Sequence, residues 1–117
     1  MSKLCIPHLL KSENPHILNL SPPLDMDPLW FQGSLAYTMA KFNMSMCVLG
    51  MAAEYSGKIA VNALWPRTAI RTAAVANVLG GQEMYDKSRK PEIMSDAAYI
   101  ILNTVSYTHL TLPTNGC

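Results

Sequence analysis

Hydrophobic residues along the chain form two short runs on either side of one long apolar segment. The runs HILNLS (16–21) and KIAVNALWP (58–66) are bounded by turn residues, and this pattern predicts two buried strands. The segment between them, SLAYTMAKFNMSMCVLGMAAEY (34–55), is too long for a strand and predicts a helix. Ser34 is its predicted N-cap and Gly57 its predicted stop.

Three further segments have helical patterns, and two segments do not. The predicted helices are residues 2–11, 68–81 and 91–103. Residues 82–90 are polar and predict a link, and the prolines of residues 21–30 predict a loop without regular structure. In the first helix, the side chains predicted to face the core are Leu4, Cys5, Leu9 and Leu10.

The long helix is apolar on nearly all sides. Its larger apolar side chains are spread over several faces, and they are Met39, Met44, Met46, Val48, Leu49 and Met51. A helix of this kind is expected to be buried on more than one side. We therefore expect it to contact the strands on one side and, on another, a second surface such as a partner subunit.

The order strand, helix, strand predicts an α/β fold. Parallel strands require a crossover connection, usually a helix, whereas antiparallel strands can be joined by a tight turn. Parallel sheets contain several strands and are covered on both faces. Two strands therefore predict part of a doubly wound parallel sheet rather than a whole domain.

Composition and charge argue against several kinds of partner, namely nucleic acids, membranes and metal ions. Half of the residues are hydrophobic, 15% are charged and the formal net charge is +1, which gives no electrostatic case for a nucleic acid or an anionic membrane as partner. No apolar run reaches the roughly 18 residues of a membrane-spanning helix. The histidines and cysteines are scattered, so no metal site is predicted, and Cys5 and Cys47 are predicted to be buried free thiols.

The C-terminal tail differs in composition from the rest of the chain. Residues 105–114, VSYTHLTLPT, are the translation of gtc tct tat aca cat ctg acg ctg ccg acg, which resembles the transposase-end adapter of sequencing libraries. We therefore predict that residues 105–117 are a non-native tail and that residues 1–104 are the segment that folds. The alternative is a polar C-terminal tail or an edge strand.

Tyr37 and Lys41 are one turn apart in the predicted long helix, so their side chains share a face. A phenol is ordinarily a weak acid near neutral pH, and an ammonium beside it favours the phenolate. Such a phenol can donate a proton to a carbonyl that receives a hydride, or accept one from an alcohol. The pair alone is weak evidence, because roughly one chain in four of this composition contains it by chance. The alternative is a surface lysine above a core tyrosine.

Two flanking features strengthen the pair. Ser21 follows HILNL at the end of the first predicted strand, where its alternative role is that of a turn serine. Asn62-Ala63-Leu64-Trp65-Pro66 lies on the second predicted strand. This order of elements resembles the C-terminal half of the catalytic domain of short-chain dehydrogenases/reductases. That half contains a strand followed by serine, then a helix with Tyr-x-x-x-Lys, then a strand with Asn-Ala-x-x-Pro. The resemblance runs from about residue 2 to residue 103.

The resemblance implies an NAD(P)-dependent oxidoreductase, with NADP or NAD bound by a Rossmann-type sheet and a hydride transferred between carbonyl and alcohol. In this family pattern Tyr37 is the acid/base, Lys41 favours the phenolate and binds the nicotinamide ribose, and Ser21 orients the carbonyl. The implied cofactor contacts are Tyr37, Lys41, Pro66, Thr68 and Ile70. The sequence departs from the pattern at Arg67, where the family commonly has glycine, and in the longer spacing between Ser21 and Tyr37.

The sequence contains no G-x-x-x-G-x-G or G-x-G-x-x-G loop to hold the cofactor phosphates. We therefore predict that residues 1–104 are a fragment of the domain, without its N-terminal cofactor-binding half, and that this fragment by itself is inactive. One alternative is a truncated, non-catalytic form that serves as an interaction or dimerisation module. A second is a binding protein that keeps the fold without the chemistry.

The resemblance also implies partners and a location. It implies a small carbonyl or alcohol substrate of lipid-like character. The charge and the apolar run lengths predict no nucleic-acid partner and no membrane span. The resemblance implies a homo-oligomer formed through the helix at 34–55. It further implies an intracellular location in the peroxisome or the mitochondrion, although the sequence contains no targeting signal of its own.

Overall fold

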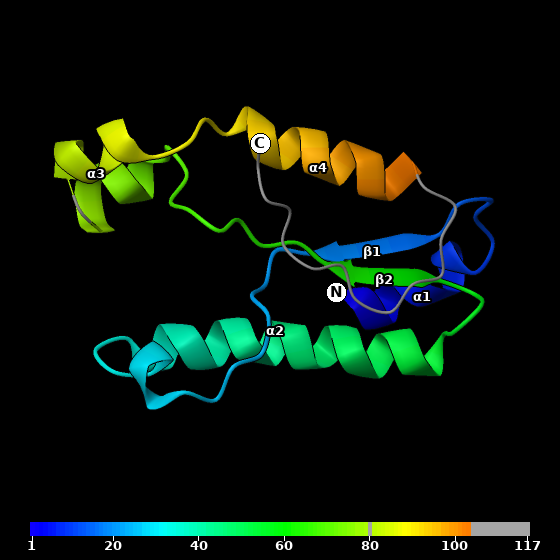
Figure 1. The fold of residues 1–117 in the computed structure, drawn as a ribbon. Helices are drawn as coiled ribbons and strands as arrows, with labels where there is room; N and C mark the ends of the chain where they lie inside the picture. The colour runs from blue at the N-terminus through cyan, green and yellow to red at the C-terminus, as the bar shows by residue number, and fades with distance from the viewer. Residues whose placement is uncertain (80, 104–117) are drawn as a thin grey trace. The chain divides into compact units, whose positions relative to one another are not determined.

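A computed structural model describes residues 1–79 and 81–103, which form two compact units, Met1–Trp65 and Pro66–Asn103 (Figure 1). The predicted non-native tail, residues 105–117, lies outside the described residues and stays a prediction. Within the ranges that are described, no helix is both long enough and apolar enough to span a bilayer.

The first unit is built on two parallel strands, as predicted. Strand β1 (His16–Asn19) pairs with β2 (Ala60–Ala63), with His16 opposite Ala60 and Asn19 opposite Ala63. Helix α2 (Leu35–Glu54) is the crossover between them (Figure 1). Both strands are shorter than the sequence predicted, but the α/β class and the parallel direction are confirmed.

The core of this unit lies between β2 and α2. Its buried apolar side chains are Val48, Ala52, Ile59, Val61 and Ala63. The last three alternate along the chain, which is the period of side chains that share one face of a strand. The intervening residues of β2 are buried as well, as expected of a strand in a parallel sheet.

Helix α1 (Ser2–Leu9) packs against this core with a different face from the predicted one. Ile6 and Leu9 contact the core cluster, whereas Leu4 is 78% exposed and Leu10 is 49% exposed. Residues 6 and 9 are three apart and share a helical face, and Leu4 and Cys5 lie off that face. The predicted role of Leu9 is confirmed, and those of Leu4, Cys5 and Leu10 were wrong.

Helix α2 is buried along one stripe within the described chain. The stripe consists of Thr38, Phe42, Ser45, Val48 and Ala52, at intervals of three and four residues. Several large apolar side chains on its other sides are exposed, and they are Leu35, Met39, Met46 and Leu49. The Cys47 thiol is exposed, like that of Cys5, so the prediction of buried thiols was wrong.

The start of α2 was predicted at the right residue. Ser34 is the N-cap, but its hydroxyl makes no capping bond and lies 3.4 Å from Thr38 Oγ1. The other end follows the prediction, because Tyr55 caps the helix and Gly57 then takes a positive φ of 76°.

The proline-rich loop contains one helical turn that was not predicted. Residues Pro28–Trp30 form a 3₁₀ turn, whose N-cap Asp27 accepts a hydrogen bond from the Leu29 N–H through its side chain. Proline is tolerated at the first helical position because its missing N–H has no partner there in any case. The inference that the prolines exclude regular structure was therefore wrong.

The second unit differs from the prediction in where its helices lie. Residues 68–72 are not helical, and a π-helical segment occupies Val75–Leu79. The predicted polar link instead forms α3 (Gly81–Lys87), while the predicted third helix is confirmed as α4 (Glu92–Asn103). Polar pairs one turn apart stabilise α3, namely Gln82 with Asp86 at 2.8 Å and Glu83 with Lys87 at 2.7 Å.

Arg71 joins the two ends of the segment that contains α3. Its guanidinium donates to the carbonyl of Ser88 at 2.9 Å and to that of Asp86 at 3.0 Å, and it lies 5.9 Å from the centre of the Tyr85 ring. Beside it, Ile70 forms a parallel bridge with Arg89. The planar fork of arginine suits two neighbouring carbonyls, so one side chain fixes the end of α3.

The two leucines at the end of α1 provide a test of the observed face. We expect Leu9→Ala to lower the free energy of unfolding by about 2 kcal/mol, because this side chain packs against the core. Leu10→Ala is the matched control and should cost less than about 0.5 kcal/mol. Urea unfolding followed by circular dichroism measures both, and equal losses would contradict the assignment of faces.

Arg71 provides a second test, in the other unit. Arg71→Met should speed hydrogen exchange of the Arg89 amide about tenfold, because the segment loses two hydrogen bonds to backbone carbonyls. Lys87→Met breaks only an exposed ion pair and should change the rate by less than about twofold. Similar rates in the two variants would show that Arg71 does not hold this segment.

Candidate active site

The predicted serine lies directly beyond β1, where the strand leaves its partner. The last hydrogen bond of the pairing runs from the Leu64 N–H to the Asn19 carbonyl at 2.8 Å. Ser21 follows two residues later and is 1% exposed. Its Oγ has no hydrogen-bond partner among the described residues. Leaving a buried hydroxyl unpaired costs about 1–3 kcal/mol. As far as the described residues go, this hydroxyl is therefore available to donate to a bound ligand.

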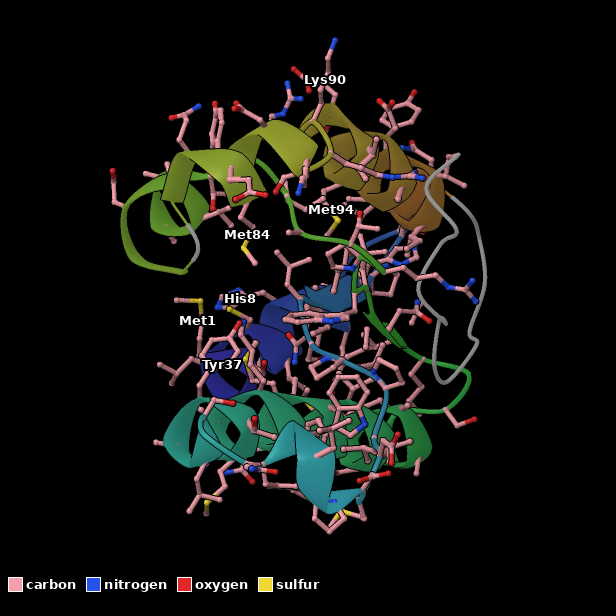
Figure 2. The ribbon with its side chains drawn as sticks, turned by 60° about the vertical axis from the view of Figure 1, so that its left-hand side comes forward. Met1, His8, Tyr37, Met84, Lys90 and Met94 are labelled. Carbon is pink, nitrogen blue, oxygen red and sulfur yellow. The ribbon has the colours of Figure 1, made fainter. Side chains whose placement is uncertain are left out.

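The predicted tyrosine lies in the first turns of α2. Tyr37 is 59% exposed, and its phenol makes no hydrogen bond within the part of the chain that the structure describes. Figure 2 shows it projecting from α2 on the side where Met1 and His8 of α1 are labelled. Tyr37 is thus not a core residue, which removes the alternative of a surface lysine above a core tyrosine.

Lys41 connects three parts of the first unit. It is half-buried on α2, one turn after Tyr37, and its Nζ donates to the Leu20 carbonyl at 3.2 Å. The same ammonium lies 5.6 Å from the centre of the ring of Trp65, which is two residues beyond the end of β2. The side chain therefore brings α2 together with the segments that leave β1 and β2 at their carboxyl ends.

Trp65 is a member of this group to which the sequence analysis gave no role. The Asn-Ala-x-x-Pro pattern marks its position but allows any residue there. The aromatic face attracts the Lys41 ammonium and helps to fix its position. The signal in the sequence was an aromatic residue at the end of a buried strand, which by itself is common.

The remaining predicted cofactor contacts belong to the second unit. Pro66 and Ile70 are half-buried there, Thr68 is exposed, and Ile70 forms the bridge to Arg89. Arg67, which stands where the family commonly has glycine, is exposed. The role of Pro66, Thr68 and Ile70 in holding a cofactor stays a prediction.

The polar groups of the first unit suit a nicotinamide nucleoside and a carbonyl. The Lys41 ammonium has donors left after its bond to Leu20, and ribose hydroxyls accept hydrogen bonds. The unpaired Ser21 Oγ suits a carbonyl oxygen as acceptor. In residues 1–79 and 81–103, no three His, Cys, Asp or Glu side chains gather in a way that could hold a metal ion.

The chain is similar in sequence to several curated proteins. It is 69% identical over 100 residues to hydroxysteroid dehydrogenase-like protein 2 of Danio rerio and 59% identical over 100 residues to that of Homo sapiens. Each match covers 86% of this chain and 24% of the relative, so the chain spans about a quarter of the relatives' length. A search against models of protein families found no match.

Solved structures give the same result for the fold. The chain matches a short-chain dehydrogenase of Mycobacterium thermoresistibile with a TM-score of 0.80 and 52% identity, covering 96% of this chain and 40% of that one. It matches a putative dehydrogenase of Xanthomonas campestris with a TM-score of 0.86 and 42% identity, and this match covers 96% of this chain and 42% of that one. In sequence and in fold, the chain is therefore similar to short-chain dehydrogenases, and it matches one part of these longer proteins.

Proposed function

We propose that this chain supplies the carbonyl-orienting and proton-transferring residues of an NAD(P)-dependent dehydrogenase, whose substrate is a carbonyl compound or the corresponding alcohol. The observation that carries the proposal is the buried Ser21 hydroxyl, which has no partner among residues 1–79 and 81–103. It occurs together with an exposed Tyr37 on the same helix as Lys41, which donates to Leu20, the residue next to Ser21. These three side chains supply a hydrogen-bond donor, a proton donor and a fixed positive charge.

Ser21 would hold the substrate carbonyl. Its hydroxyl donates to the carbonyl oxygen, which gains negative charge as the carbon is reduced. A donor that is aimed before the reaction stabilises this charge without reorganisation. Because Ser21 is buried, its hydroxyl does not spend this capacity on solvent.

Tyr37 would complete the reduction by giving its phenolic proton to the carbonyl oxygen. A bound nicotinamide would supply the hydride to the carbon of the same group. In the direction of oxidation, Tyr37 accepts the alcohol proton, so one side chain serves both directions. Its exposure leaves the phenol accessible to a substrate.

Lys41 would bind the ribose hydroxyls of the cofactor with the donors that its bond to Leu20 leaves over. It is one turn from Tyr37 on the same helical face, so the bound cofactor and the phenol would lie on one side of the helix. The bond to Leu20 and the contact with Trp65 limit the directions in which this long side chain can turn.

The alternative is that the chain acts as an interaction module without catalysis. The observation in its favour is the set of exposed apolar side chains on α2, which are Leu35, Met39, Met46 and Leu49. Apolar surface of this kind is suited to contact with another protein surface, including a second copy of the chain. Only the catalytic proposal requires the Tyr37 hydroxyl.

Removal of that hydroxyl tests the catalytic proposal. In the full-length dehydrogenase that contains this segment, Tyr37→Phe should lower kcat by about 10² to 10⁴, because the proton donor is lost. The reaction can be followed by the loss of NADPH absorbance, with phenanthrenequinone as probe substrate.

Tyr99→Phe is the matched control, because Tyr99 is also exposed, at 70%, but lies on α4 in the other unit. It should keep full turnover. Full turnover by Tyr37→Phe as well would refute the proposed chemistry.

The 117-residue chain by itself is expected not to bind the cofactor tightly. Its sequence contains no glycine-rich loop to hold the phosphates at a helix N-terminus. Titration of the purified chain into NADPH should therefore give no saturable change in nicotinamide fluorescence, whereas the full-length protein should give one. Saturable binding by the short chain would contradict this expectation.

A further inference from the structure

The loop that carries Ser21 has few backbone donors, so its carbonyl groups are the main points at which hydrogen bonds can hold it. Ser21 and Pro22 both precede a proline, which restricts them to extended backbone. Pro22 and Pro23 have no N–H and cannot donate to a neighbour. The carbonyls of Leu20 and Pro22, on either side of Ser21, are acceptors through which a partner can fix this segment.

Helix α2 supplies a donor to each of these two carbonyls. Lys41 Nζ donates to Leu20, and Ser45 Oγ donates to Pro22. Residues 41 and 45 are one turn apart and share a helical face. In extended backbone, groups two residues apart point to the same side, which explains how one face of α2 reaches both carbonyls.

The hydroxyl of Ser45 is committed to this contact. The residue is 2% exposed, within the buried stripe of α2, and its bond to Pro22 crosses from the helix to the loop. Lys41 is different, because the proposed function also assigns it to the ribose of a cofactor. Of the two donors to the carbonyls on either side of Ser21, Ser45 is thus the one without a second task in the proposed reaction.

We propose that Ser45 is a positioning residue, which fixes the backbone at Pro22 so that the Ser21 hydroxyl points to the substrate carbonyl. This role rests on the proposed function, because it requires that Ser21 contacts the substrate. Ser45 itself contacts neither substrate nor cofactor. Its effect on the reaction passes entirely through the direction of the Ser21 hydroxyl.

The test compares the loss of the Ser45 hydroxyl with and without Ser21, in the full-length dehydrogenase with NADPH and phenanthrenequinone. Ser45→Ala should lower kcat about tenfold and leave the KM for NADPH unchanged, because a misaligned donor weakens only the reacting state. In a Ser21→Ala background the same change should have no further effect on kcat. A merely structural role would reduce kcat in both backgrounds.

Two further variants complete the test. Ser45→Cys keeps an unbranched side chain and a weak donor, so it should lose less kcat than Ser45→Ala. It replaces that variant if alanine prevents folding. Thr38→Val is the matched control, because it removes another buried hydroxyl of α2 that donates to a loop carbonyl, that of Trp30 at 2.6 Å. It should reduce stability without the tenfold loss of kcat.

The possible failures can be told apart. Wild-type kcat in Ser45→Ala and Ser45→Cys, together with an inactive Tyr37→Phe, would overturn the role of Ser45 alone. An equal loss of kcat on Ser45→Ala with and without Ser21 would do the same. Full turnover by Tyr37→Phe would overturn the proposed function, and the role of Ser45 with it.

Discussion

The parallel pairing of β1 with β2 is the constraint on which the first unit depends. Parallel neighbours cannot be joined by a tight turn, so the chain must return along a crossover, and α2 is that crossover. The return places the first half of α2 next to the segment that leaves β1. This explains how Lys41 reaches the Leu20 carbonyl although the two residues are far apart in sequence.

The buried stripe of α2 divides into two parts with different tasks. In the second half, Val48 and Ala52 pack against β2 and provide apolar contact. Closer to the start of the helix, Thr38 and Ser45 donate hydrogen bonds to the loop between β1 and α2. A helix that was apolar along the whole stripe would pack equally well on the strands, but it would leave a proline-rich loop with few partners for its carbonyls.

The sequence predicted the elements whose signal is local. The two strands, α2 and α4 follow from apolar runs, helical periodicity and turn residues, and the fold class follows from their order. The face of α1 was missed because leucines occur on several of its sides and conceal the spacing of Ile6 and Leu9. Helix α3 was missed because its stability comes from polar pairs one turn apart rather than from apolar periodicity.

The same distinction applies to the candidate site. The spacing of Tyr37 and Lys41 is a local pattern and was visible in the sequence. The contact of Ser45 with the Pro22 carbonyl joins distant parts of the chain through a backbone atom, and no residue pattern records it.

The exposure of Met39 and Met46 has a further consequence, because oxidation converts a methionine into a polar sulfoxide. Oxidants would thus change the exposed surface of α2 at these two residues, while the buried core residues of the helix, Val48 and Ala52, contain no sulfur and keep their chemistry.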